Sequence, residues 1–353
     1  MVKQGTVVVF VAALLAQSAS AQTVEEFYKG KRITITVGYG TGGGYDVFAR
    51  LLSRHIGKYL PGNPQFVVQN MPGAGSLTAA NYLYTNAPKD GTAFGLFARD
   101  MPLMALLGHN ANVKFDPRKF TWLGSSSDFS DDAYVMIVRN DASVKSIEQM
   151  LKPGGPQLVL GGTADGATGG DVPRILQAGL GLQNLKLILG YRDSADVFLA
   201  IERNEVQGRT TDLSAIQSNR PAWLKPGGGY HLLVQYARRT RHPNFPDVPT
   251  ARELASSQSG RALIEFMETP LLTMARPYAA PPGVPADRAK ALQTAFLAAH
   301  RDPQFLEEAR KVGVYVSPVS AEEMARSIEQ MAQAPAALME QARKILESGK
   351  GGG

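Results

Sequence analysis

The chain has 353 residues, no cysteine and a formal net charge of +6 at pH 7. Without cysteine it can form neither a disulfide nor a thiolate metal site. Its lysines and arginines are scattered without a basic block, which argues against nucleic acid as a partner. The length suits two domains of ordinary size, and the mildly basic balance favours small anions as ligands.

The N-terminus has the pattern of an export signal. Lys3 precedes an apolar run over 7–16 that is too short to span a bilayer, and residues 19–21 have the small-x-small form that signal peptidase cleaves. We therefore expect residues 1–21 to be a signal peptide, cleaved near Ala21, and the mature protein to be periplasmic.

A glycine-rich loop over 38–44 joins a predicted strand at 33–37 to a predicted helix that Asp46 opens. Glycines let the chain turn sharply and direct several backbone N–H groups at a ligand, near the positive end of the helix dipole. The loop is therefore expected to bind an anion. Asp46 itself is expected to cap the helix and so to fix the angle of the loop.

The same order of elements continues along the chain. The first part also has predicted strands at 66–68 and 92–98 and a predicted helix at 77–84, with a second glycine loop at 71–76. Strand, loop and helix in alternation predict a parallel α/β sheet with both glycine loops at one edge.

A second set of elements begins near residue 131 and repeats this architecture, with a third glycine-rich loop over 161–170. Its predicted strands lie at 134–139, 158–160, 185–189, 206–209 and 232–237, and its predicted helices at 146–151, 172–180 and 197–201. The C-terminal part is predicted to form helices at 286–300, 303–312 and 324–338 that cover the rest of the fold. A capping box, Ser320 with Glu323, opens the last of these.

Two enzymatic interpretations, a dinucleotide-dependent enzyme and a hydrolase, fit the sequence less well than a binding protein does. Residues 38–43 match the G-x-G-x-x-G fingerprint of dinucleotide sites, but Asn70 stands where an acidic residue would hold the ribose. No G-x-S-x-G or H-E-x-x-H motif occurs, and the five histidines have no catalytic or metal spacing. The sequence favours binding without turnover, with no metal and no cofactor.

Five motifs in order along nearly all of the mature chain resemble the substrate-binding receptors of tripartite tricarboxylate transporters, the Bug-type solute receptors. The matching segments are Thr41-Gly-Gly-Gly-Tyr-Asp46 with Ala49-Arg50, Gln69-Asn-Met-Pro-Gly-Ala-Gly75 with Asp90-Gly-Thr-Ala93, Phe115-Asp-Pro-Arg-Lys-Phe120, Pro246-Asp-Val-Pro-Thr250 and Ala280-Pro-Pro-Gly-Val-Pro285.

The resemblance implies a type II periplasmic-binding-protein fold, in which two α/β lobes are joined by two crossovers and enclose a ligand cleft. The first lobe would comprise 22–127 and 236–353, and the second lobe 128–235. Such a receptor captures a small organic carboxylate and delivers it to a membrane permease with a large and a small subunit. We expect it to act as a monomer.

The resemblance, together with the loop analysis, gives a set of candidate ligand-binding residues. They are Tyr39, Thr41, Gly42, Gly43, Gly44, Tyr45, Asp46, Gly73, Ala74, Gly75, Ser76, Thr163, Thr168, Gly169, Arg192 and Asp193. Tyrosines beside a glycine loop can stack on or hydrogen-bond a ligand, and Arg192 offers charge. These side chains favour an aromatic acid or a longer dicarboxylate.

Two alternatives remain open from the sequence. One is an exported α/β enzyme that acts on a phosphorylated or carboxylated metabolite. The other is a sensory receptor that presents its ligand to a signalling partner in place of a permease.

Overall fold

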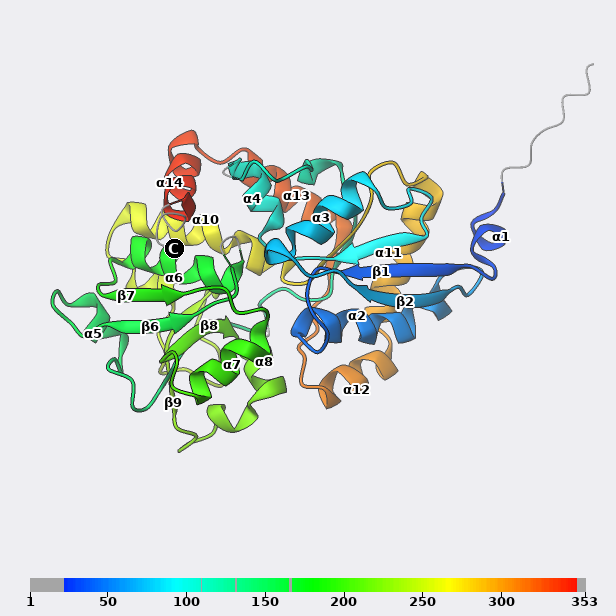
Figure 1. The fold of residues 1–353 in the computed structure, drawn as a ribbon. Coiled ribbons are helices and arrows are strands. Elements are labelled where there is room, and N and C mark those ends of the chain that lie inside the picture. The colour runs from blue at the N-terminus through cyan, green and yellow to red at the C-terminus, as the bar shows by residue number, and fades with distance from the viewer. Residues whose placement is uncertain (1–21, 109, 131, 165–166, 348–353) are drawn as a thin grey trace, which may run out of the picture.

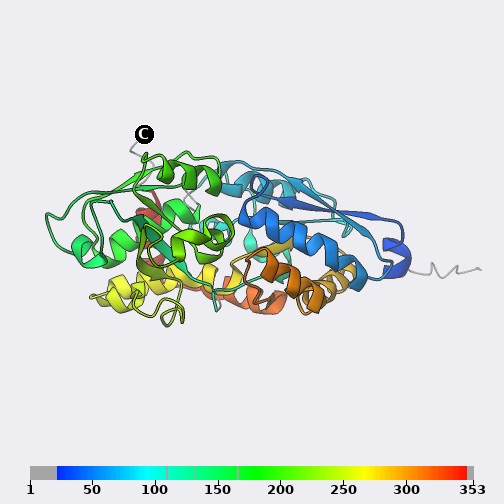
Figure 2. The ribbon, with the colours of Figure 1, turned by 90° about the horizontal axis from the view of Figure 1, so that it is seen from below.

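The computed structural model describes residues 22–108, 110–130, 132–164 and 167–347. They form two mixed β-sheets, one in each half of the molecule, with helices on both faces of each sheet (Figure 1). Seen from below, the two halves give an elongated molecule (Figure 2). The expected signal peptide over 1–21 lies outside the described residues. Among the described helices, none combines the length and apolar character needed to cross a bilayer.

The first sheet has six strands, which are β1 (Arg32–Val37), β2 (Gln65–Asn70), β3 (Ala93–Leu96), β4 (Thr121–Ser125), β10 (Pro277–Ala280) and β11 (Val319–Ser320). Their order across the sheet is β11-β4-β10-β3-β1-β2. Strand β1 pairs in parallel with β2 and with β3, so the loops that follow β1 and β2 start from the same edge, as predicted. Strand β10 runs antiparallel to β3 and β4, and β11 antiparallel to β4.

Helices on both faces bury this sheet. They are α1 (Val24–Tyr28), α2 (Gly44–His55), α3 (Leu77–Thr85), α4 (Met101–Leu107), α11 (Ala286–His300), α12 (Pro303–Lys311) and α13 (Ala321–Ala332). The last helix, α14 (Ala336–Glu347), contacts α4 but otherwise lies against helices of the other half (Figure 1). The alternating Ile33, Ile35 and Val37 of β1 are fully buried and share an apolar cluster with α2, α11 and α12. Helices α3, α4 and α13 contribute to the cluster on the other face.

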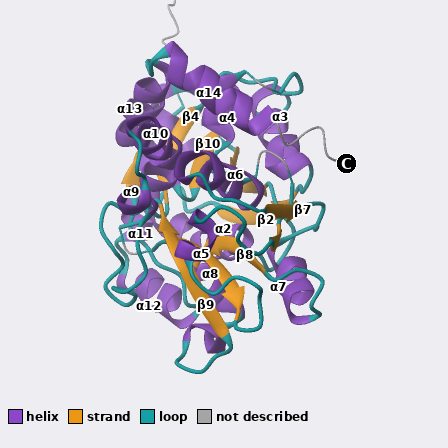
Figure 3. Ribbon diagram, turned by 90° about the vertical axis from the view of Figure 1, so that its left-hand side faces the viewer, coloured by secondary structure: helices purple, strands orange, loops and turns teal. Residues whose placement is uncertain are grey.

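The second sheet has five strands, which are β5 (Tyr134–Arg139), β6 (Leu158–Gly161), β7 (Leu185–Ile188), β8 (Gly208–Asp212) and β9 (Tyr230–Tyr236). Their order is β7-β6-β8-β5-β9, and β5 runs antiparallel to both of its neighbours. Helices accompany it: α5 (Ile147–Leu151), α6 (Thr168–Leu180), α7 (Ser194–Glu202), α8 (Leu213–Asn219), α9 (Ala251–Leu254) and α10 (Gln258–Met274). Figure 3 looks onto this half, where α6 and α10 lie to one side of the strands and α7 to the other.

The chain crosses between the sheets twice, from β4 to β5 and from β9 to β10. The two connections are bonded to each other. The backbone N–H of Ser126 donates to the carbonyl of Arg276, and Nη1 of Arg238 donates to the carbonyls of Phe129, Ser130 and Asp132 at 2.6–3.1 Å. This crossover pair fixes Arg276 at the junction of the two halves.

Most predicted elements are present with small changes of boundary. The capping box of Ser320 and Glu323 is confirmed, and α2 and α6 begin earlier than predicted, at Gly44 and Thr168. The predicted helix over 324–338 was wrong, because α13 ends at Ala332 and α14 begins at Ala336. Several short or irregular elements were not predicted from the sequence, namely α1, α4, α8, α9 and α10 and the strands β4, β10 and β11.

Candidate functional site

A cavity of about 90 Å³ lies between the two halves. Residues from both halves line it: Tyr39, Gly40, Gly43, Gly44, Tyr45, Arg99 and Arg276 on one side, and Tyr134, Thr163, Thr168, Asp193, Ser194, Arg209, Thr211, Asp212 and Ala215 on the other.

The glycine loop after β1 reaches the cavity at the N-terminus of α2. Gly43 is the N-cap residue and has no capping side chain, so the first N–H groups of the helix remain unmatched within it. The expectation that Asp46 caps the helix was wrong, because Asp46 is the third residue of α2. Its carboxylate instead accepts hydrogen bonds from the backbone N–H of Gly42, Nε of Arg50 and Nδ2 of Asn70, each at 2.9 Å. Asp46 thus ties the loop to the helix and to β2.

Two tyrosines from this loop form an aromatic wall of the cavity. The rings of Tyr39 and Tyr45 stack with centroids 4.6 Å apart. The hydroxyl of Tyr45 accepts hydrogen bonds from Nε of Arg99 at 2.9 Å and from its backbone N–H at 3.3 Å. The guanidinium of Arg276 lies over the Tyr45 ring, 4.9 Å from its centroid.

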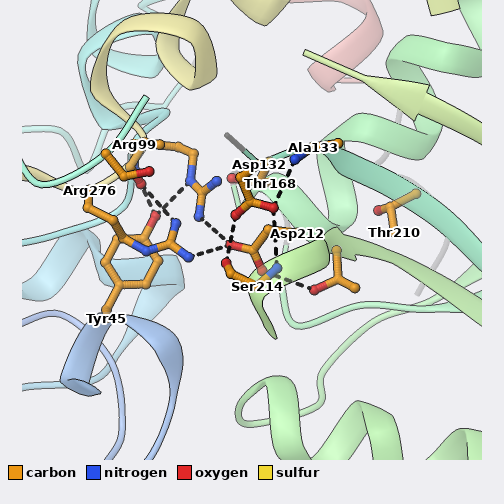
Figure 4. A network of polar contacts seen from close by, with 12 residues as sticks. Tyr45, Arg99, Asp132, Ala133, Thr168, Thr210, Asp212, Ser214 and Arg276 are labelled. Atoms are coloured by element: carbon orange, nitrogen blue, oxygen red, sulfur yellow. Dashed lines mark hydrogen bonds and ion pairs between the residues drawn. The ribbon is translucent and has the colours of Figure 1, made fainter. Parts of the chain in front are cut away.

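Asp212, at the end of β8, pairs with two arginines of the other half (Figure 4). Its Oδ2 accepts from Nη2 of Arg99 at 3.2 Å and from Nη2 of Arg276. Arg99 follows β3 and Arg276 precedes β10, and all three side chains are at least 93% buried. The contact is therefore a buried ion pair that joins the two sheets.

A third arginine lines the cavity without a carboxylate partner among the described residues. Nη1 of Arg209 donates to the carbonyl of Ser194 at 2.8 Å, and its guanidinium lies 4.7 Å from the ring centroid of Phe198. Arg209 lies inside strand β8 and is 4% exposed. The Arg209 guanidinium thus contacts a backbone carbonyl and an aromatic ring but no carboxylate of the described residues. It can therefore bind an anionic ligand.

Burial and charge together set the protonation states. Burial raises the pKa of Asp212, but Arg276 and Arg99 outweigh it and hold that pKa well below the ordinary value. Burial raises the pKa of Asp100 to about 6, and burial with the charge of Asp212 raises the pKa of Asp132 to about 6. Asp212 is therefore fully ionised at neutral pH, whereas Asp100 and Asp132 take up protons as the pH falls toward 6.

Two of the cavity arginines carry a buried hydrogen-bond donor without an acceptor among the described residues. Nη1 of Arg99 and Nε of Arg276 are buried and have no acceptor among the described residues. Of the described lining residues, three are arginines and two, Asp193 and Asp212, are aspartates, so the lining is positive when all five are ionised. An anion bound here would satisfy donors whose burial is otherwise costly.

The structure brings part of the predicted set together in this cavity. Seven of the sixteen candidates line it, namely Tyr39, Gly43, Gly44, Tyr45, Thr163, Thr168 and Asp193. Gly73, Ala74, Gly75, Ser76 and Arg192 line a neighbouring depression of about 370 Å³, which shares Tyr39 and Thr163 with the cavity. Thr41, Gly42, Asp46 and Gly169 line neither. The Arg192 side chain is 78% exposed and lies 3.5 Å from Asp193 and 3.4 Å from Asp196.

The second glycine loop has an unusual backbone. Gly73, Ala74, Gly75 and Ser76 all have positive φ, from 48° to 144°. Oγ of Ser76 accepts the backbone N–H of Ala98 at 3.0 Å, which ties this loop to the chain after β3. Successive backbone N–H groups in such a turn form an anion-binding concavity.

The buried charged residues of the cavity, Arg99, Arg209, Arg276 and Asp212, were not predicted from the sequence. Each lies in or next to a buried strand, where a charged residue is rarely buried unless it has a partner. An arginine inside a predicted strand at 206–209 was the available signal. Their assembly depends on how the two sheets face each other, which no local pattern encodes.

Among the residues that the structure describes, no group of three or more His, Asp or Glu is placed to hold a metal ion. The geometry offers anion recognition: cationic side chains, a helix N-terminus and an aromatic wall around an interior cavity.

Comparisons with known proteins agree with this geometry. A family model described as tripartite tricarboxylate transporter family receptor matches residues 48–343. A UPF0065 protein of Bordetella pertussis is 24% identical over 330 residues, covering 90% of each chain. A UPF0065 protein of Cupriavidus necator is 25% identical over 248 residues, covering 69% of this chain and 70% of the relative.

Solved structures share the fold. The periplasmic binding protein BugD has a TM-score of 0.69 at 20% identity, covering 90% of this chain and 98% of its own. An adipate-bound protein of Rhodopseudomonas palustris has a TM-score of 0.66 at 20% identity, covering 90% and 97%. Malate-bound MatC of the same species has a TM-score of 0.63 at 19% identity, covering 89% and 99%. The fold is therefore that of the periplasmic binding proteins, as expected, and the match over most of its length shows that the chain belongs to the tripartite tricarboxylate transporter receptor family.

Proposed function

We propose that this receptor captures an organic carboxylate in the cavity between its two halves and delivers it to a tripartite tricarboxylate-type permease with a large and a small subunit. The observation that carries the proposal is the set of three buried arginines, Arg99, Arg209 and Arg276, around one cavity with buried donors that lack acceptors. The carboxylate would lie on these donors and near the N-terminus of α2.

Receptors of this family are periplasmic and bind rather than transform their ligands. We propose that residues 1–21 are a signal peptide cleaved near Ala21, and that the mature receptor acts as a monomer. We also propose that 22–127 with 236–353 forms one lobe and 128–235 the other, and that they close over the ligand. The stacked rings of Tyr39 and Tyr45 favour a ligand whose body is aromatic or apolar.

A thermal-shift screen of the mature chain tests the binding function. Aliphatic acids, including malate and adipate, and aromatic acids would be compared with sugars, phosphates and nucleotides. A ligand that binds the native state raises the melting temperature by mass action, so the proposal predicts a rise with carboxylates only. A rise with nucleotides or phosphates and none with carboxylates would contradict it.

A further inference from the structure

Asp212 occupies the place where an anionic ligand would meet two of the cavity's three arginines. Its Oδ2 accepts from Nη2 of Arg99 at 3.2 Å and from Nη2 of Arg276, and its side chain is 7% exposed. Asp212 comes from the second sheet and both arginines from the first half. A carboxylate of the protein itself therefore neutralises one of the two positive charges that the first half presents to the cavity.

The remaining positive charge is small. Arg209 makes no ion pair with a described residue. The other aspartate of the described lining, Asp193, is committed to helix α7, since its Oδ1 accepts the backbone N–H groups of Ala195 and Asp196 at 2.9 and 3.1 Å. With three arginines and two aspartates in the described lining, one positive charge is thus left for a ligand, and Arg209 is the arginine without an ion pair to a described residue.

We infer that Asp212 sets the charge of the ligand: with its carboxylate on Arg99 and Arg276, the cavity selects a monocarboxylate over the dicarboxylate of the same chain length. This inference rests on the proposed function and specifies its ligand class. The single carboxylate of the ligand lies on Arg209, and its uncharged body lies against Tyr39 and Tyr45.

A second ligand carboxylate has no matching cation. It would lose its hydration on entering the cavity, and the described lining offers no further positive side chain to compensate that loss. It would also lie close to the ionised Asp212 and be repelled by it. The malate- and adipate-bound neighbours of this fold hold dicarboxylates, so the inference separates this receptor from them.

Isothermal titration of the mature protein with matched acids tests the inference. Hexanoate is compared with adipate, and butanoate with succinate, because each pair differs only in a terminal methyl or carboxylate. The wild type should bind the monocarboxylate of the preferred pair at least about tenfold more tightly than the dicarboxylate, roughly the effect of one unmatched charge. Asp212→Asn should lower that ratio at least about tenfold by freeing two guanidinium groups.

Two variants serve as controls. Asp212→Glu keeps the charge and should keep the preference for the monocarboxylate. Asp196→Asn removes a carboxylate of α7 that lies outside the cavity lining, and should leave the ratio within about twofold. Circular dichroism of each variant checks the fold, and the wild-type ratio alone already decides the inference if Asp212→Asn does not fold.

The possible outcomes distinguish a failure of the inference from a failure of the proposed function. Tighter binding of adipate or succinate by the wild type, or an unchanged ratio in folded Asp212→Asn, overturns the role of Asp212 and leaves the carboxylate receptor intact. No binding of any carboxylate, in these pairs or in the wider screen, overturns the proposed function together with the inference.

Discussion

At the scale of single residues, the site depends on polar groups that support one another. The Tyr45 hydroxyl accepts two hydrogen bonds from Arg99, and Asp212 accepts from Arg99 and Arg276. A buried charge is tolerated only with such partners, and removal of one partner leaves the other uncompensated. The cavity arginines are therefore held in place before any ligand arrives.

Tyr45→Phe should destabilise the fold by about 1–3 kcal/mol, because the ring stack with Tyr39 remains but Arg99 loses its acceptor. Urea unfolding of wild type and variant measures the difference. Tyr82→Phe, at a half-buried tyrosine away from the cavity lining, is the matched control and should change stability little. Equal stabilities for Tyr45→Phe and the wild type would mean that the hydroxyl does not support Arg99.

At the scale of elements, the two glycine loops differ in what they tolerate. Gly43 has φ of −75°, and an added Cβ would meet nothing closer than the Gly40 carbonyl at 3.8 Å. Gly75 has φ of 62°, a left-handed conformation that costs a β-branched residue roughly 1–2 kcal/mol or more. The same substitution should therefore act on binding at one loop and on stability at the other.

We predict that Gly43→Val folds with nearly wild-type stability and loses carboxylate binding, because the new side chain lies at the cavity wall. Gly75→Val should instead lower the urea midpoint. Urea titrations and calorimetric binding of both variants check this pair. Unchanged affinity in Gly43→Val would remove the first loop from the ligand site.

Helix α11 contains a buried histidine that links it to the first crossover. Nε2 of His300 lies 2.7 Å from Oγ of Ser126, and Nδ1 lies 2.7 Å from the Phe296 carbonyl. Burial lowers the pKa of His300 to about 4. Because the unfolded chain then binds the proton more tightly than the folded chain, His300 stabilises the fold fully above pH 6.5, and this contribution falls between pH 6.5 and 4.

His300→Gln should therefore flatten the decline in stability between pH 6.5 and 4 by about 3 kcal/mol, the size that the shift implies. Unfolding free energies at both ends of this range measure the slope. His231→Gln, at an exposed histidine, should keep the wild-type slope. If the unfolding free energy of His300→Gln changes with pH as steeply as that of the wild type, His300 does not cause this pH dependence.

Local patterns predicted most elements of the molecule. The alternation in β1 and the capping box of α13 were sufficient to predict these two elements, because neighbouring residues determine both patterns. Strand β10 was missed, since Pro277–Ala280 is short and its antiparallel place between β3 and β4 depends on residues far away in the chain. The first glycine loop could be predicted at the cavity because its own local sequence determines it, whereas Arg99, Arg276 and Asp212 could not, because distant parts of the chain bring them together.

At the scale of the whole molecule, the two halves meet at the crossovers and at the cavity. The Asp212 ion pairs join the second sheet to the first half, and Arg238 ties one crossover to the other through the carbonyls of Phe129, Ser130 and Asp132. Two bodies joined by two connections are the arrangement in which hinge closure occurs. The proposed closure over a ligand in the cavity would couple binding energy to that motion.

The most direct test of the account titrates the best carboxylate of the thermal-shift screen into wild type, Arg209→Gln and Arg192→Gln. Arg209 lines the cavity and has no acidic partner among the described residues, whereas the Arg192 side chain is 78% exposed and pairs with Asp193 and Asp196. The account predicts that Arg209→Gln weakens binding at least about tenfold and that Arg192→Gln changes it less than about twofold. Unchanged affinity in Arg209→Gln, with a large loss in Arg192→Gln, would place the carboxylate outside this cavity and contradict the account.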